Sequence, residues 1–371
     1  MNMLFAVPCL LGLEAPIADE LKQMGAFDVT CENGRVIFSG DESILARANI
    51  NCRCAERIQI IMGSFVARSF EELFEGTKNL PWELWIGKTD AFPVKGYSLN
   101  SKLFSVSDCQ SIIKKAVVER LKQRYKLQWF QETGALYQIQ FSIMKDRVTL
   151  LIDTSGVGLH KRGYRPAANA APLKETLASA LCNFAHLRDY HTLYDPMCGS
   201  GTILIEGALA ACNIAPGLNR HFTAEKWRQI PESVWARERE RARDNEKKDR
   251  IFRAYGSDID AAALDIARLN AKRAGVDDLI TFKKCDIKDF STVTEKSTLI
   301  VNPPYGERLM DINSARELYS VMGQAFVPGR GKSYYIITAD EDFEKHFGRK
   351  ADKRRKLYNG MLKCQLYMYF K

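Results

Sequence analysis

The sequence predicts a doubly wound α/β domain in its C-terminal part, preceded by a module of mixed α+β units. From about residue 190 onward, short apolar strands alternate with amphipathic helices, a pattern typical of a mostly parallel sheet. Before that point, strands are grouped in hairpins between helices. The chain has 371 residues, of which 46% are hydrophobic, so two or three domains of ordinary size are expected.

The first 65 residues predict a small α+β domain. A strand near the start is followed by an amphipathic helix that ends at Gly25. Asn33-Gly34 lies between two short strands and is a strong hairpin signal. A second helix and another strand complete the order β-α-β-β-α-β, which indicates a ferredoxin-like fold for residues 1–65.

Residues 66–165 predict a second α+β domain with one long amphipathic helix. Ser107 is a candidate cap for this helix, and the apolar side chains that follow it have helical spacing. One side of the helix is basic, which fits either a solvated face or a surface that binds RNA. The basic side chains are Lys114, Lys115, Arg120, Lys122, Arg124 and Lys126. Because Pro166 and Pro172 flank a stretch of small residues, we expect the third domain to span residues 166–371.

Charge and cysteine content limit the class of protein. The net charge is +9, which fits a nucleic-acid partner but is shared by many proteins without one. The 10 Cys are scattered, and the Cys52/Cys54 pair lacks the further ligands of a zinc site. The N-terminal stretch has no basic segment of a secretory signal, and no run of about 18 apolar residues occurs. We therefore expect free thiols, no metal and a cytoplasmic protein.

The first candidate site follows the short strand 192–194. An acidic residue ends this strand, and small residues lead into a helix whose first N–H groups are free. A carboxylate at this position suits a ligand with an ammonium group, such as S-adenosylmethionine, better than a pyrophosphate. A plain tight turn is the alternative. The candidate cofactor residues are Asp195, Pro196, Met197, Cys198, Gly199, Ser200, Gly201 and Thr202.

Two further acidic residues follow the next two strands. Asp258, before Ile259, comes where a carboxylate can accept both ribose hydroxyls of an adenosyl group. Asp286, before Ile287, is placed to accept the adenine amine, although an Asp at a strand end is also a common turn or cap residue. The charged helix that separates the first site from Asp258 fits a solvated face or a contact with RNA.

The sharpest signal is Asn302-Pro303-Pro304-Tyr305, directly after an apolar strand. The two prolines make the segment stiff and remove N–H donors. Backbone carbonyls and the Asn302 oxygen can then accept from an exocyclic amine and orient its nitrogen lone pair. Tyr305 can stack on the base, which must be unstacked to reach this pocket. Asn302 is also a candidate for cofactor contact.

The segment between the second and third domains is basic. Its position predicts either a solvated hinge or a coupling of RNA binding to the pocket through phosphate contacts. The candidate RNA-binding residues here are Lys161, Arg162, Tyr164 and Arg165. No His-based metalloprotease motif, phosphate-binding loop or Ser-hydrolase motif competes with this interpretation.

These motifs resemble those of class I methyltransferases that modify base amines. DPMCGSGT resembles the first cofactor motif of that fold, and NPPY resembles the catalytic motif of amino-methyltransferases that act on adenine or guanine. The arrangement is most similar to THUMP-domain RNA methyltransferases that make N2-methylguanosine in large-subunit ribosomal RNA. GLHKRGYR, APLKETLASAL, DPMCGSGTILIEGA and IVNPPYGERL resemble stretches of that family, and SVSDCQSIIKKAVVERLK resembles the helix of a THUMP domain.

The resemblance implies a ferredoxin-like domain, a THUMP domain that binds RNA and a class I (Rossmann-like) catalytic domain with S-adenosylmethionine. It further implies that Lys174, Glu175 and Thr176 contact the amino-acid end of the cofactor, and that the chain makes a single modification. Guanine N2 in 23S ribosomal RNA is the expected target. Transfer RNA, adenine N6 in RNA or DNA, and an RNA-binding assembly factor without catalysis remain alternatives.

Overall fold

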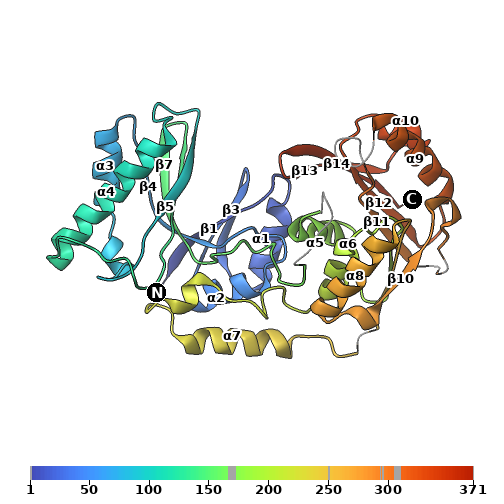
Figure 1. Cartoon of the computed structure of the whole chain (residues 1–371), viewed down its shortest axis with the longest axis horizontal. Helices are drawn as coiled ribbons and strands as arrows, with labels where there is room; N and C mark the ends of the chain where they lie inside the picture. Colours follow the sequence, from blue (N-terminus) through green and yellow to red (C-terminus); the bar gives the residue numbers. More distant parts are fainter. Residues whose placement is uncertain are drawn as a thin grey trace.

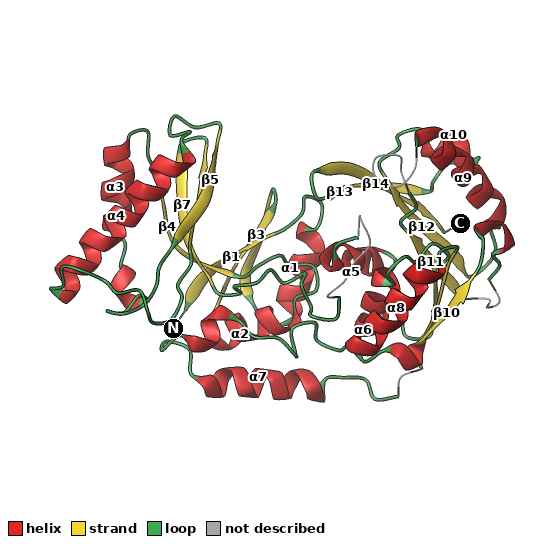
Figure 2. Cartoon of the chain, in the orientation of Figure 1, coloured by secondary structure: helices red, strands yellow, loops and turns green. Residues whose placement is uncertain are grey.

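The protein contains two seven-stranded sheets, each with its own helices (Figures 1 and 2). A computed structural model describes residues 2–165, 173–249, 251–292, 294, 296–304 and 311–370. The two expected classes of sheet are both present: the N-terminal sheet is mainly antiparallel, and the C-terminal sheet is mainly parallel. No described helix is long and apolar enough to cross a membrane.

The N-terminal unit has the predicted order of elements. The Asn33-Gly34 hairpin is confirmed, and Gly34 has the positive φ of +76° that this turn requires. Asp41 caps the second helix by accepting a hydrogen bond from the Ile44 N–H at 2.9 Å. The elements are β1 (Met3–Pro8), α1 (Glu14–Gln23), β2 (Phe27–Glu32), β3 (Arg35–Gly40), α2 (Glu42–Asn51) and β4 (Gln59–Val66).

The second unit continues the same sheet. Its long helix begins at Val106, so Ser105 and not Ser107 is the cap: the Ser105 hydroxyl accepts from the Asp108 N–H at 3.4 Å. Ser107 lies inside the first turn of the helix, one residue after its first position. The elements are α3 (Phe70–Lys78), β5 (Val94–Leu99), α4 (Val106–Tyr125), β6 (Ile139–Met144) and β7 (Arg147–Asp153).

β4 belongs to both N-terminal units. The strand order is β2-β3-β1-β4-β7-β6-β5, and β4 pairs with β1 on one side and with β7 on the other. The expected boundary after residue 65 therefore falls inside a strand, because β4 extends to Val66. The two units share one continuous sheet.

The C-terminal sheet has the order β10-β9-β8-β11-β12-β14-β13, with β8 to β12 parallel and β14 antiparallel to β12. The final hairpin at Asn359-Gly360 is confirmed. The strands are β8 (Thr192–Asp195), β9 (Arg253–Asp258), β10 (Ile280–Lys284), β11 (Ser297–Val301), β12 (Lys332–Thr338), β13 (Lys353–Asn359) and β14 (Leu362–Tyr369). The helices are α5 (Glu175–Phe184), α6 (Thr202–Ala211), α7 (Glu232–Asp244), α8 (Ala261–Ala274), α9 (Ile312–Ala325) and α10 (Phe343–Phe347).

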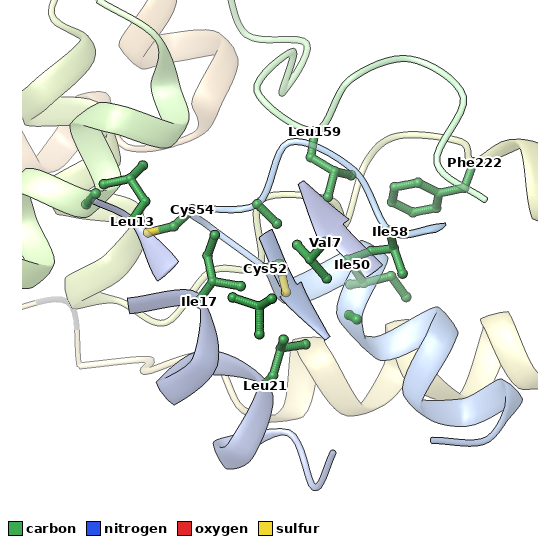
Figure 3. Packing of buried hydrophobic residues seen from close by; sticks show 14 of the residues in the cluster. Val7, Leu13, Ile17, Leu21, Ile50, Cys52, Cys54, Ile58, Leu159 and Phe222 are labelled. Atoms are coloured by element: carbon green, nitrogen blue, oxygen red, sulfur yellow. The ribbon is translucent and has the colours of Figure 1, made fainter. Parts of the chain in front are cut away.

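Residues 213–244 form an arm that leaves the parallel-sheet domain and packs on the N-terminal units. The Gly217 N–H donates to the Ile50 carbonyl at 2.8 Å, and the ring of Trp227 stacks on Tyr137 with centroids 4.5 Å apart. Phe222 lies in the same core as Ile58 of the ferredoxin-like unit (Figure 3). The charged helix α7, expected to be solvated or to contact RNA, packs against α2 and is held there by an ion pair between Arg47 and Glu238 at 2.7 Å.

The cysteines do not form a metal site. All ten are free thiols. Cys52 and Cys54 are buried in the hydrophobic core, where burial raises the pKa of both thiols well above the ordinary value. No group of three or more potential metal ligands occurs among the described residues.

Candidate cofactor and base site

The carboxyl ends of adjacent parallel strands bring the predicted motifs together. β10, β9, β8 and β11 are neighbours in that order, and each is followed by one candidate segment. Ligands of doubly wound sheets bind beyond the carboxyl ends of the strands, near the point where the strand order reverses. Here that point lies between β8 and β11, next to Asp195 and Asn302.

Asp195 ends β8 and is buried, with 2% of its surface exposed. Its Oδ1 accepts from the Met197 N–H at 3.2 Å. Burial, together with the nearby Asp258 carboxylate, raises the pKa of Asp195 to about 8 despite that hydrogen bond. A buried carboxyl with a raised pKa and one weak partner is suited to receive a cationic group.

The loop after Asp195 is fastened to the end of β9. The Cys198 N–H donates to the Ser257 carbonyl at 2.9 Å, and the Gly199 N–H donates to Asp258 Oδ2 at 2.9 Å. Gly201 precedes α6 with φ +78°, a conformation that favours glycine. A Cβ there would lie 3.2 Å from Ala267 and 3.3 Å from Phe282, so the loop packs closely on its neighbours.

Asp258 and Asp286 occupy equivalent places after β9 and β10. Asp258 Oδ1 accepts from the Asp260 N–H at 3.0 Å, while Ile259 beside it is 65% exposed. Asp286 Oδ1 accepts from the Lys288 N–H at 3.0 Å and caps a short 3-10 helix, whereas Ile287 is buried. Asp286 is therefore a helix cap, which is one of the two roles that the sequence left open for it. Each carboxylate oxygen can accept more than one hydrogen bond, so these contacts leave room for a ligand.

Asn302 follows β11 and carries an unsatisfied oxygen. Its Oδ1 is buried and has no hydrogen-bond partner among the residues that the structure describes. A buried acceptor without a partner costs about 1–3 kcal/mol and calls for a ligand or another explanation. Tyr305 lies outside the described residues.

Tyr319 of α9 holds the segment after Asn302. Its hydroxyl lies 3.1 Å from the Pro304 carbonyl, to which it donates, and 3.0 Å from Thr338 Oγ1 at the end of β12. Tyr319 is fully buried. This contact fixes the Pro304 carbonyl, next to the buried Asn302 oxygen that could accept from a substrate amine. No local pattern in the sequence had marked Tyr319.

The family of the chain follows from its catalytic half. Residues 162–368 match the family described as "RMKL-like, methyltransferase domain". The chain belongs to this methyltransferase family. Residues 4–59 match the "RlmL ferredoxin-like domain" and residues 67–153 match the THUMP domain, so both N-terminal fold expectations are confirmed.

Relatives of this methyltransferase fall into two size classes. "Putative RNA methyltransferase YpsC" of Bacillus subtilis is 45% identical over 97% of this chain and 94% of its own length. "Ribosomal RNA large subunit methyltransferase K/L" of Syntrophotalea carbinolica is 33% identical over 96% of this chain but only 52% of its own length. The chain thus spans about half the length of its K/L relatives.

Two solved structures cover this methyltransferase from end to end. A "predicted N6-adenine-specific DNA methylase" from Listeria monocytogenes is 46% identical, covers 100% of this chain and 96% of its own, and has a TM-score of 0.94. SMU.472, described as "a putative methyltransferase complexed with SAH", is 40% identical, covers 100% of this chain and 98% of its own, and has a TM-score of 0.95.

The start of α5 makes contacts that the sequence did not predict. The Thr176 hydroxyl donates to Glu56 Oε1 of the N-terminal module at 2.8 Å, and Lys174 Nζ lies 3.3 Å from Glu56 Oε2. Glu175 pairs with Arg165 at 3.1 Å. The Thr176 side chain is buried and its hydroxyl proton is donated to Glu56, while the cofactor contact expected for Thr176 stays a prediction.

The linker residues expected to bind RNA are mostly internal. Arg162 and Tyr164 are 8% and 4% exposed, and both reach Glu206 of α6: Arg162 Nη2 at 3.5 Å and the Tyr164 hydroxyl at 2.9 Å. Arg165 donates to the Thr202 hydroxyl at 2.9 Å, next to the first cofactor loop. Both side chains are buried and bound to Glu206, so neither offers an exposed group to a phosphate in this arrangement, and their role in RNA binding stays a prediction. Lys161 is exposed.

The basic helix α4 offers fewer free charges to RNA than its charge pattern indicated. Lys114 Nζ pairs with Glu132 at 2.5 Å and lies 3.5 Å from the centre of the Phe92 ring. Arg120 pairs with Glu83 at 2.7 Å. Lys115 is exposed. Of the two α4 residues proposed for RNA, only Lys115 keeps a solvent-facing charge without a carboxylate partner within the described residues.

Proposed function

We propose that the chain transfers a methyl group from S-adenosylmethionine to the N2 amine of a guanine in large-subunit ribosomal RNA. The observation that carries this proposal is the buried Asn302 oxygen, which has no partner within the described part of the chain and lies beside the loop that follows Asp195. An orphaned acceptor at this edge of the sheet suits an exocyclic amine, which has two N–H donors to offer.

The residues after β8, β9 and β10 fit this cofactor. The Asp195 carboxyl suits the ammonium of its amino-acid end, and Asp258 retains lone pairs for the ribose hydroxyls. Ile259, at 65% exposed, offers apolar surface that the adenine ring would cover. We assign Asp286, after β10, to the adenine amine. When bound, the cofactor supplies a methyl group on a positively charged sulfur.

The chain contributes position and polarity to the reaction. Asn302 Oδ1 and the Pro303 carbonyl each accept one N–H of the base amine, which fixes its plane and directs the nitrogen lone pair toward the methyl group. Tyr319 keeps the Pro304 carbonyl occupied and the segment rigid. The amine nitrogen forms a bond to the methyl carbon as the sulfur–carbon bond breaks, and the nitrogen then releases one proton to water.

The substrate class rests on the N-terminal module and the relatives. A THUMP match and K/L relatives named for large-subunit ribosomal RNA support an RNA substrate, and guanine N2 is proposed from the resemblance of the sequence motifs. Adenine N6 is the second candidate, because the Listeria relative is described as an adenine-specific DNA methylase. The Asn-Pro-Pro segment serves either base.

Methyl transfer from labelled cofactor to unmodified total RNA, followed by nucleoside digestion, tests the proposal. N2-methylguanosine in the large ribosomal RNA supports it, and the same assay with a deoxy-oligonucleotide should give no label. N6-methyladenosine would agree with the mechanism but would show that adenine and not guanine is the target base. Label in transfer RNA would contradict the ribosomal substrate.

A further inference from the structure

The sheet of the THUMP domain has a row of four side chains, one from each of four strands, and three of them are apolar and exposed. The strand register places Val66 of β4 beside Arg147 of β7, Arg147 beside Met144 of β6, and Met144 beside Leu99 of β5. Val66, Met144 and Leu99 are 50%, 46% and 53% exposed. Tyr97, on the same face of β5, is 53% exposed. We name these five residues the sheet platform.

The platform lies on the side of the sheet that α3 and α4 leave free. These two helices pack on each other and on β4 and β5 from the opposite side. Figure 1 shows α3 and α4 on the side of β4, β5 and β7 that lies away from the catalytic domain. Helix α4 thus lies on the outer side of the sheet, and the other face of the sheet is turned toward the side on which the catalytic domain lies.

The second row of this face consists of small hydroxyl residues. The register aligns Tyr97 with Ser142, Ser142 with Thr149, and Thr149 with Ser64. The Ser64 and Thr149 hydroxyls lie 3.5 Å apart, and the Tyr97 hydroxyl lies 3.8 Å from the Met144 sulfur. Ser142 and Thr149 are only 8% and 5% exposed, so the accessible part of this region is the Tyr97 ring and the Met144 thioether, which suit flat rings.

Positive charge gathers at the end of the platform. Lys145 and Asp146 form the β6–β7 turn with φ of 51° and 64°, a conformation that is strained for a lysine and held by the surrounding segments. Asp146 accepts from the Lys102 N–H at 2.8 Å and lies 3.5 Å from Arg68. This carboxylate is therefore engaged. The basic side chains at this end are Arg68, Lys102, Lys145 and Arg147.

We propose that the sheet platform binds an unpaired segment of the RNA substrate. This inference rests on the proposed function, since it concerns how that RNA is held. An exposed apolar patch of this kind marks a binding surface. Positive charge at its end complements phosphates, and Tyr97 offers a face on which an unstacked base can lie. Base-paired RNA would keep its bases away from the ring, so a single strand is the favoured partner.

Fluorescence anisotropy of a labelled single-stranded RNA of about 12 nucleotides, titrated with the full chain, tests this surface. We expect Tyr97→Ala to weaken binding about tenfold, as loss of one stacked base does, and Tyr97→Phe to bind within about twofold of wild type. Arg147→Ala should reduce the slope of log K against log salt by about one. Tyr190→Ala, at an exposed tyrosine of the catalytic domain, is the matched control.

Lys115→Ala tests the competing surface on α4. If it weakens binding as strongly as Tyr97→Ala, or if Tyr97→Ala binds like wild type, the platform is not the RNA surface. A duplex of the same sequence that binds as tightly and depends equally on Tyr97 would also overturn the proposal. If the wild-type chain binds the strand through Tyr97 but methylates no RNA, the proposed function fails while the platform remains.

Discussion

Removal of the Glu206 carboxylate should destabilise the junction between the N-terminal module and the catalytic domain. Glu206 is fully buried in α6 and lies 3.5 Å from Arg162 Nη2, whose side chain is 3% exposed. Its carboxylate also accepts from Tyr164 and Ser179. Burial by itself lowers the pKa of Arg162, but Glu206 together with Tyr164 and Glu175 outweighs burial and raises it. The guanidinium is therefore charged and depends on this partner.

The expected magnitude follows from what each substitution leaves behind. Glu206→Ala leaves the Arg162 cation buried without its carboxylate, which costs about 3–5 kcal/mol. Glu206→Gln keeps an acceptor for the Tyr164 hydroxyl and removes only the charge, so a loss of about 2 kcal/mol is expected. Glu206→Leu combined with Arg162→Met removes both charges and should be more stable than Glu206→Ala.

Urea unfolding followed by circular dichroism, with limited proteolysis at Lys161, measures these effects. Glu240→Ala, at an exposed glutamate of α7, is the control and should change stability by less than about 0.5 kcal/mol. A Glu206→Ala chain as stable as this control would refute the reasoning. So would a double variant that is no more stable than the single one.

Three further predictions concern the site and the arm. Since the pKa of Asp195 is raised to about 8, its carboxyl is mostly protonated at pH 7 and ionises as pH rises. The affinity for the cationic cofactor, measured by calorimetry, should therefore increase between pH 6 and pH 8. Asp195→Asn should flatten this pH profile. Tyr319→Phe should lower kcat about 10- to 100-fold with little change in cofactor affinity, because the Pro304 carbonyl loses its donor; unchanged kcat would contradict the positioning role. Trp227→Ala should cost about 3–5 kcal/mol through lost stacking on Tyr137, measured by urea unfolding, and a loss below about 1 kcal/mol would show that the arm does not hold the THUMP domain.

The local features of this chain were predictable because their causes are local. Asn-Gly pairs at 33–34 and 359–360 fix hairpins through backbone conformations that glycine favours. The grouping of Asp195, Asp258 and Asn302 also follows from the sequence, since the carboxyl ends of parallel strands meet at one edge. The cap of α4 was less certain, because Ser105 and Ser107 both satisfy the capping pattern and only the start of the helix distinguishes them.

The interior of the junction was not predictable, because its partners are distant in sequence. Arg162 and Tyr164 lie in a basic segment typical of a surface, yet Tyr164 bonds Glu206, 42 residues away. Thr176 bonds Glu56, 120 residues away, in another domain. Periodicity reports which side of one element is apolar and carries no information on such pairs. The packing of the arm that carries Trp227 on the N-terminal units was not predictable for the same reason.

The role of Asn302 is the central claim, and one paired measurement tests it most directly. Methyl transfer to unmodified ribosomal RNA and calorimetric affinity for S-adenosylhomocysteine are compared in wild type, Asn302→Ala and the exposed control Asn313→Ala. The account predicts that Asn302→Ala loses methyl transfer at least 100-fold, roughly the effect of removing one positioned acceptor, with cofactor affinity nearly unchanged. An Asn302→Ala chain that still methylates RNA at the wild-type rate would contradict the account.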